Sequence, residues 1–416
     1  MQEGLTGWRS VVYCAGMQAF SIYLHIPFCT HRCGYCDFNT YAGIEDLIPE
    51  YVSALCQEAG LAGEASGERL PVHTIFFGGG TPSLLPPAEI ERILDTLDRV
   101  FALMPGIEIS LEANPGTLSP SFLASLYSLG VNRLSLGMQA AQPQALRLLE
   151  RQHGYNDVIN SVTWARQAGF RNLNLDLIFG LPYQDLTEWR QSLDYALRLE
   201  PEHLSLYALT LEHGTPLAHW VARGLLTEPD PDLAAEMYEW AGERTARAGF
   251  IQYEISNFAR PDGEGGSYAC RHNLQYWRGL PYLGLGAGAH GYAAGVRTSN
   301  VLSPKAYVER CLSGLRQRSE KVPGFPVTPA TVTAQAVEGK SEMGEFMIMG
   351  LRLTKEGVSS KQFQQRFGES LEEVYGEEIR ELVALNLLEK AGNDGDILRL
   401  TPGGRLLGNQ AFIQFI

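Results

Sequence analysis

Residues 21–36 read SIYLHIPFCTHRCGYC and decide the fold. The first six are apolar, aromatic or β-branched, which is typical of a strand, and Pro27 ends the strand because it has no amide hydrogen to donate. Cys29, Cys33 and Cys36 then follow on what we predict to be a loop. A loop can turn several thiols toward one point, which a continuing strand cannot do. The stretch therefore predicts a strand that leads into a site made by three thiolates.

The chemistry of the three thiols limits what this loop can bind. Three thiolates suit a soft iron or zinc centre. A structural zinc site usually closes with four ligands in two pairs, and the chain has no second Cys-x-x-Cys. A disulfide framework is not expected in a chain of 416 residues with seven scattered cysteines. We favour a [4Fe–4S] cluster, since three cysteines leave one iron free of protein ligands.

Composition indicates which partners and which cellular compartment to expect. The formal net charge of −14 counts against nucleic acid, because phosphate contacts need clustered Lys and Arg. No apolar run reaches the ~18 residues of a membrane span, and residues 1–20 lack the layout of a signal peptide. Reduced cysteines and an oxygen-sensitive cluster fit the cytoplasm. We therefore expect a cytoplasmic protein that binds no nucleic acid.

Strands and helices alternate along the first half of the chain. This alternation predicts βα units around a parallel sheet, and the six units predict an α/β fold of the partial (β/α)6 barrel type. The functional loops of such barrels follow the carboxyl ends of the strands. We expect strands at 21–26, 73–77, 106–112, 133–136, 173–178 and 203–206, and helices at 47–60, 86–103, 119–129, 142–150, 155–168 and 186–197.

The chain also divides into expected domains. Residues 1–20 form an N-terminal extension, 21–320 the barrel with its own extension, and 321–340 a linker rich in Pro and Thr. Residues 341–416 then give three helices and a small hairpin, an order that resembles a winged helix. The third helix, at 371–385, carries five Glu residues. We therefore expect a lid or docking domain rather than a DNA reader.

The spacing Cys-x3-Cys-x2-Cys after a first strand resembles the radical S-adenosylmethionine (SAM) superfamily. Five further stretches are similar to its HemN/HemW branch, which contains oxygen-independent coproporphyrinogen III oxidases and HemW-type haem chaperones. The resemblance extends from about residue 21 to the C-terminus, and it implies that SAM chelates the free iron of the cluster. The five stretches are HIPFC (25–29), FGGGTPS (77–83), GMQ (137–139), DLIFGLP (176–182) and YLGLGAGAH (282–290).

The resemblance implies a SAM site around the cluster. In it, Tyr23 contacts SAM, Tyr35 lies near the adenine, the peptide carbonyls of the glycine stretch accept from the ammonium group, and Glu112 accepts from both ribose hydroxyls. The alternatives are core packing for Tyr23, a tight turn for the glycines and a solvated carboxylate for Glu112. The implied set is Tyr23, Tyr35, Gly79, Gly80, Thr81 and Glu112.

Gln139, Arg151 and Asp176 match residues that hold a second SAM in the oxidase. Asp176 lies in an apolar strand, where a carboxylate needs a partner. Arg151 is a candidate for that partner. A structural ion pair between the two side chains is therefore the alternative to a second SAM site.

Residues 270–277, CRHNLQYW, resemble the His-Asn-x-x-Tyr-Trp signature of the HemW type. The resemblance implies that His272, Asn273, Tyr276 and Trp277 bind haem. A neutral imidazole can be an axial ligand of haem, and the aromatic rings offer faces to the macrocycle. The alternative is a buried aromatic cluster around a hydrogen-bonded histidine.

Two functions follow from the resemblance. The first is a haem chaperone with a [4Fe–4S] cluster and SAM, which delivers haem to respiratory apoproteins, with the membrane surface as one meeting place, and which uses an electron donor. The second is an oxygen-independent coproporphyrinogen III oxidase, which makes protoporphyrinogen IX by radical oxidative decarboxylation. We favour the chaperone without the dehydrogenase activity. Asp37 and Phe38 follow Cys36 where the oxidase has x-Cys, and the oxidase's longer N-terminal segment is abbreviated.

Two questions stay open at this point. A methyltransferase or an anaerobic haem-degrading enzyme shares the SAM motifs and is a third, weaker reading. The sequence also leaves open a homodimer.

Overall fold

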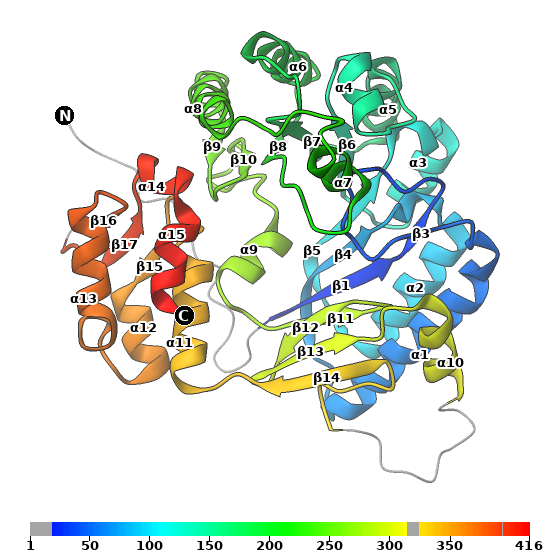
Figure 1. Ribbon diagram of the computed structural model, residues 1–416. Coiled ribbons are helices and arrows are strands. Elements are labelled where there is room, and N and C mark those ends of the chain that lie inside the picture. Colours follow the sequence, from blue (N-terminus) through cyan, green and yellow to red (C-terminus); the bar gives the residue numbers. More distant parts are fainter. Residues whose placement is uncertain (1–18, 314–323, 393) are drawn as a thin grey trace.

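The computed structural model describes residues 19–313, 324–392 and 394–416 (Figure 1). The expected N-terminal extension therefore lies outside the described residues, apart from its last two positions. None of the helices in the described part of the chain is both long enough and apolar enough to cross a bilayer.

A sheet of twelve strands forms the centre of the larger part of the molecule (Figure 1). The six predicted strands lie side by side and parallel, so the α/β prediction is confirmed. Within the described residues the sheet continues past both ends of this parallel run, so the barrel is open. The parallel strands, in spatial order, are β11 (Tyr282–Leu285), β1 (Phe20–Ile26), β4 (Pro71–Gly79), β5 (Ala102–Ala113), β6 (Arg133–Gln139), β7 (Leu173–Phe179) and β8 (His203–Ala208).

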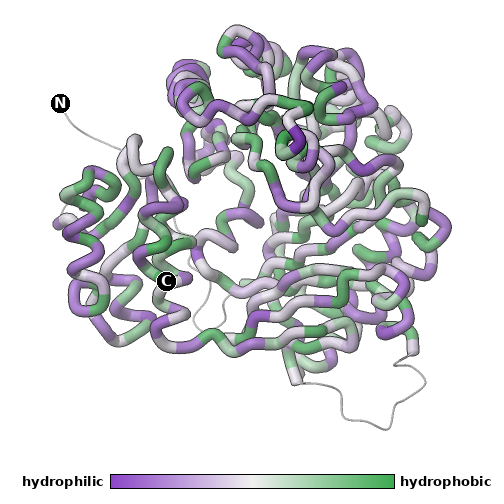
Figure 2. The backbone as a smooth tube through the Cα atoms, in the orientation of Figure 1, coloured by the Kyte–Doolittle hydropathy of each residue, from purple (hydrophilic) through white to green (hydrophobic). Residues whose placement is uncertain are grey.

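Helices cover the outer face of the parallel strands (Figure 1). In α2 (Pro87–Val100) the apolar side chains recur at helical spacing, and Ile90, Ile93, Leu94 and Leu97 are all buried. Helices α6 and α8 show both hydrophilic and hydrophobic residues (Figure 2), as helices with one face on a core should. Besides α2, the helices of this layer are α1 (Ile48–Ser66), α3 (Pro120–Ser128), α4 (Pro143–Leu148), α5 (Tyr155–Ala168), α6 (Leu186–Arg198) and α8 (Pro231–Arg247). The short α7 (Pro216–Ala222) lies against the cysteine loop instead, where Leu217 N donates to Gly34 O.

Antiparallel strands extend the sheet at both ends. One of them, β14 (Thr331–Ala336), lies inside the segment that we expected to be a linker. It pairs with β13, with Thr333 opposite Ser299, because its β-branched residues suit an edge strand and its prolines precede it. The remaining strands of this sheet are β9 (Ile251–Gln252), β10 (Asn257–Ala259), β12 (His290–Ala293) and β13 (Val296–Asn300).

The buried carboxylate of Glu58 links the first helix of the larger part of the molecule to residues 286–328 near the end of that part. Glu58 on α1 is fully buried, and burial raises its pKa. Its Oε2 accepts from Gly286 N (2.8 Å) and from the Tyr307 hydroxyl (2.7 Å), which belongs to α10 (Pro304–Ser313). Its Oε1 accepts from Asn300 Nδ2 and Thr328 Oγ1, both at 2.8 Å. Four donors thus converge on one side chain, and they come from segments more than 200 residues away.

The C-terminal residues form a second, smaller hydrophobic core, beside the sheet in Figure 1. Met347, Phe363, Tyr375 and Leu400 are buried in it. Three helices and a hairpin follow in the predicted order, and the first helix begins at Gly339, inside the segment that we expected to be a linker. The domain boundaries stay a prediction. The elements are α11 (Gly339–Gly350), β15 (Val358–Ser359), α12 (Ser360–Phe367), α13 (Leu371–Ala384), β16 (Leu388–Ala391), β17 (Ile397–Leu400), α14 (Pro402–Leu406) and α15 (Gly408–Phe412).

Candidate functional site

The cysteine loop begins where β1 ends. The short strands β2 (Phe28–Cys29) and β3 (Tyr41–Ala42) pair in parallel and close the loop between them. Each thiol then has a polar neighbour from a different direction. Cys29 Sγ lies 3.6 Å from Thr81 Oγ1, and Cys33 Sγ accepts from Arg151 Nη1 at 3.6 Å. Cys36 Sγ lies 4.0 Å from Thr40 Oγ1.

The donor set fits an iron–sulfur cluster. Burial raises the pKa of Cys29 and of Cys36, and neighbouring thiols of the loop raise it further, so a bound cationic group would favour the thiolate forms of these two side chains. No three Cys, His, Asp or Glu side chains in the described ranges are arranged around a single metal ion. A cluster takes one thiolate at each of three irons and does not need thiols that converge on one ion.

Gly79 and Gly80 end β4 directly against the cysteine segment. Gly80 N donates to Ile26 O and Thr81 N donates to Phe28 O, both at 2.8 Å. A Cβ on Gly80 would lie 2.6 Å from Phe28 O, and Gly79 has a φ of +112°. The glycines are therefore needed for a close approach of the chain to itself, as the tight-turn alternative expected. Their role toward SAM stays a prediction.

Glu112 and Tyr23 line a small cavity of about 200 Å³ inside the barrel. Glu112 Oε2 accepts from Gly79 N at 3.1 Å. Burial, and then the nearby Asp176 carboxylate, raise the pKa of Glu112 to about 7. Tyr23 is hydrogen-bonded through its hydroxyl to His25 Nδ1 at 3.0 Å. Glu112 is thus a buried carboxylate rather than a solvated one, and this is the condition in which it could bind a ligand's hydroxyls.

The ion pair between Arg151 and Asp176, which was the alternative to a second SAM site, does not form in the described structure. Arg151 instead donates to Cys33 Sγ and, at 3.2 Å, to Gly137 O, while its Nε is buried without a hydrogen-bond partner. Asp176 accepts from Ser135 Oγ at 2.9 Å and from Asn174 Nδ2 at 2.7 Å. Neutral neighbours therefore stabilise Asp176, and the guanidinium is directed to the cysteine loop.

The two remaining SAM candidates also lie at this end of the barrel. Gln139 ends β6 with a φ of 62°, and a Cβ on Gly137 would meet both its side chain and that of Arg151. Tyr35 packs in a small apolar cluster with Leu149 and Leu181. The structure thus brings Gln139 beside Arg151, and it places Tyr35 against the loops that follow other strands.

Sequence analysis missed one buried cation. Arg133 on β6 is 2 % exposed and lines the same small cavity as Glu112 and Asp176. Its Nε is buried without a hydrogen-bond partner. Arg133 is the first residue of β6, and an arginine at such a position is usually exposed. Nothing in the sequence therefore indicated that this side chain is buried.

His272 occupies the inner end of the haem signature. It lies on α9 (Arg271–Trp277), is 1 % exposed and stacks on Phe76 with 5.1 Å between ring centroids. Thr74 donates its hydrogen to Ser21 (2.6 Å), so His272 Nδ1 donates to Thr74 at 2.8 Å. His272 Nε2 is then left to accept from the Tyr276 hydroxyl at 2.7 Å.

Both ring nitrogens of His272 are therefore engaged, as in the alternative of a hydrogen-bonded histidine in an aromatic cluster. Burial lowers its pKa to about 3, so the ring is neutral. Haem ligation by His272 stays a prediction, and it requires the bond to Tyr276 to break. All four signature residues line cavities: His272 and Asn273 line the small one, Trp277 a larger one, and Tyr276 both.

The larger cavity, of about 500 Å³, lies between the antiparallel strands β11–β13 and helix α11. This volume is within the range of pockets that hold small molecules and cofactors. Tyr23 and Tyr276 line both cavities, so the two cavities are neighbours. Phe38, which stands where the oxidase has a further cysteine, lines the larger cavity and is 61 % exposed.

Comparison with known proteins gives the family. Residues 23–196 match the model of the radical SAM superfamily, and residues 337–407 match that of the HemN C-terminal domain. The chain is 39% identical over 399 residues to the haem chaperone HemW of Bacillus subtilis, covering 95% of this chain and 99% of that protein. It is 44% identical over 295 residues to HemW of Mycobacterium tuberculosis, covering 70% and 74%.

The fold has a solved counterpart. The structure of coproporphyrinogen III oxidase (HemN) from Escherichia coli matches 96% of this chain and 90% of its own, with a TM-score of 0.77 and 23% sequence identity. At that identity the likeness speaks for the architecture alone, and it agrees with the parallel sheet and the C-terminal unit described above. The sequence relatives extend further, and by them the chain belongs to the HemW family of haem chaperones within the radical SAM superfamily.

Proposed function

We propose that this protein carries haem to respiratory apoproteins in the cytoplasm and holds a [4Fe–4S] cluster and SAM while it does so. The observation that carries the proposal is the 39% identity to a haem chaperone over nearly the whole of both chains. Membership of the radical SAM superfamily implies the cluster and SAM. We further propose that the protein uses an electron donor, that respiratory apoproteins receive the haem, and that two chains form a homodimer.

The chain's own residues have distinct tasks in this function. Cys29, Cys33 and Cys36 hold the cluster, and Arg151 neutralises charge on the loop through its contact with Cys33. The cluster, when bound, supplies an open iron and an electron. Glu112 offers a buried carboxylate to SAM. Tyr23 lines both the small cavity beside Glu112 and the larger cavity.

Haem would contact the aromatic end of α9. Trp277 lines the larger cavity and Tyr276 lines both cavities, so their rings offer apolar faces to a macrocycle. His272 supports this surface through its bond to Tyr276. We retain haem contact by His272 and Asn273 as part of the proposal.

Two measurements on anaerobically purified protein test the proposal. Iron and sulfide analysis should give about four of each per chain, and haem titration should give a Soret band that weakens in His272→Ala. Turnover of coproporphyrinogen III, assayed in parallel, should be absent. Zinc in place of iron and sulfide, or decarboxylation without a haem band, would contradict the proposal.

A further inference from the structure

One face of the antiparallel strands is turned to the larger cavity. Tyr282 lies opposite Tyr292, and Tyr292 lies opposite Arg297 across β11, β12 and β13. His290 is two residues from Tyr292 and therefore shares its face of the sheet. All four side chains line the cavity.

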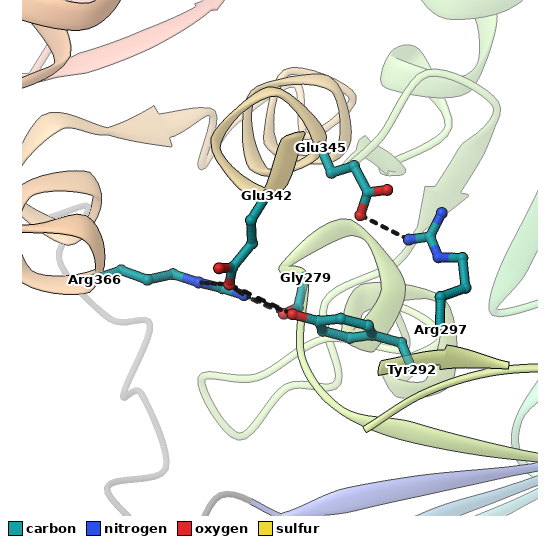
Figure 3. A network of polar contacts seen from close by, with 6 residues as sticks. All are labelled: Gly279, Tyr292, Arg297, Glu342, Glu345 and Arg366. Carbon is teal, nitrogen blue, oxygen red and sulfur yellow. Dashed lines mark hydrogen bonds and ion pairs between the residues drawn. The ribbon is translucent and has the colours of Figure 1, made fainter. Parts of the chain in front are cut away.

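Helix α11 forms the opposite wall with a single stripe. Glu342, Glu345, Phe346 and Met349 line the cavity at positions i, i+3, i+4 and i+7, which is one face of a helix. The cavity is thus a slot between a sheet face and a helix face. Its walls are largely aromatic, and its charged groups gather at the side shown in Figure 3.

Two ion pairs line this slot, one between β13 and α11 and the other between α12 and α11 (Figure 3). Arg297 Nη2 lies 2.8 Å from Glu345 Oε2, and Arg366 Nη2 lies 2.8 Å from Glu342 Oε1. The Arg366 group also donates to Gly279 O at 3.2 Å. All four charged side chains are between 26 % and 40 % exposed. Ion pairs with this much exposure add little to stability, so another carboxylate can replace the glutamates at small cost.

We propose that this slot takes a planar aromatic dicarboxylate, the chemistry of a porphyrin, and that Arg297 and Arg366 exchange Glu345 and Glu342 for the two carboxylates of the ligand. The inference rests on the proposed function, which supplies haem as the cargo. Three observations support it: a volume of about 500 Å³, aromatic walls, and two guanidiniums that line the cavity. Guanidinium forks bind carboxylates in bidentate fashion, which fixes the orientation of a flat ligand.

The imidazoles around the slot differ in their freedom to bind iron. His25 lines the slot, but its ring nitrogens are bonded to Tyr23 and to Asn39 O, both at 3.0 Å. His272 lies behind Tyr276 with both nitrogens engaged. His290 lines the slot, is exposed, and makes no side-chain hydrogen bond within the described structure. In this conformation His290 is the imidazole that can give a lone pair to iron without losing a bond.

Replacement of the two glutamates by the carboxylates of the ligand also couples ligand binding to the C-terminal unit. Glu342 and Glu345 belong to α11, whereas Arg297 lies on β13 of the sheet. Once a ligand holds the arginines, α11 loses its ion pair to β13 and its ion pair to α12. Binding of the dicarboxylate should therefore loosen α11 and, with it, one wall of its own site.

The test is a titration of the full-length, cluster-loaded protein with ferric protoporphyrin IX. Glu342→Gln/Glu345→Gln should tighten haem several-fold, because the arginines are then free, and Arg297→Gln/Arg366→Gln should weaken it at least tenfold. The dimethyl ester of haem should bind both variants alike. His290→Ala should change the Soret position. Hydrogen exchange should show faster exchange of α11 in wild type when haem is added.

A matched control lies on the same interface. The pair Arg278–Glu356, at 2.6 Å and 42 % exposed on both sides, also joins the segment after α9 to the C-terminal unit, but neither residue lines the slot. Arg278→Gln/Glu356→Gln should leave haem affinity unchanged. Equal affinities in all the variants overturn the inference and leave the proposed function standing. A wild-type protein that binds no haem overturns both.

Discussion

Arg151 Nη1 lies 3.6 Å from Cys33 Sγ, so a buried guanidinium is held against one of the three thiols of the cysteine loop. This contact was not expected, because sequence analysis assigned Arg151 to SAM or to an ion pair with Asp176. A positive charge at this distance favours the thiolate and any added negative charge on a cluster that the thiolate holds.

Arg151→Gln should therefore make a bound cluster harder to reduce. The expected result is a more negative midpoint potential and faster loss of iron in air, because the favourable charge is gone. A redox titration followed by visible absorption measures the first effect. Arg147→Gln, at an exposed position on α4 just before the loop that carries Arg151, is the control. Identical midpoint potentials in the two variants would contradict an effect of the Arg151 charge on the cluster.

Glu112 should make stability depend on pH. Its pKa is about 7 in the folded chain and about 4.5 when unfolded, so the folded state keeps a proton that the unfolded state has lost. Stability is full below pH 4.5 and falls as pH rises to 7, by at most roughly 3 kcal/mol. Glu112→Gln should be more stable than wild type at pH 8 and should lose that advantage toward pH 5.

Urea unfolding at several pH values checks this expectation on cluster-free protein. The glutamine keeps an acceptor for Gly79 N, so loss of that bond does not confuse the result. SAM affinity should fall in the same variant. A stability difference that does not change with pH would refute the assignment to Glu112.

Gly80→Ala should disrupt the contact between β4 and the cysteine segment. The added Cβ would lie 2.6 Å from Phe28 O and 2.9 Å from Ile26 O, and both are backbone atoms that cannot move alone. We expect a loss of about 1–3 kcal/mol and a lower iron content. Thermal unfolding and iron analysis measure the two effects. Gly60→Ala, which meets nothing within 4 Å on α1, should be neutral or slightly stabilising.

Glu58→Gln should destabilise the larger part strongly. Each carboxylate oxygen accepts two hydrogen bonds, so an amide group in place of either oxygen would face two donors. A cost of about 3–5 kcal/mol is expected for breaking such a buried charged network. Chemical denaturation measures it, with exposed Glu91→Gln as the control. A cost under ~1 kcal/mol would show that the network rearranges.

The parallel strands were predictable because each is a short apolar run that precedes a helix. Their pairing follows from the βα order, and the structure bears it out. The antiparallel strands were not predictable in the same way. Residues 331–336 carry Thr and Ala without a buried face, and only β13 makes them a strand. The start of β5 at Ala102, four residues early, has a similar cause, since it pairs with Pro71 of β4.

The site was predictable where one motif decides the chemistry. The cysteine loop is such a case, since its motif indicates a cluster site, and the roles of its three thiols stay a prediction. Contacts between side chains were harder to predict, because the sequence does not indicate which polar groups form hydrogen bonds with one another. Arg133 has no motif at all, and the engagement of both His272 nitrogens depends on Thr74 and Ser21 from other strands.

The place of β1 in the sheet has a consequence for synthesis. This strand carries the cysteine loop and pairs on one side with β4, but its other partner is β11, which ends at Leu285. A nascent chain on the ribosome must therefore wait for about two hundred and sixty more residues before that edge closes. Until then the cysteine loop follows a strand that is paired on one side only. An assembly factor that delivers iron and sulfide during translation could therefore bind the edge of β1 that β11 covers in the folded protein.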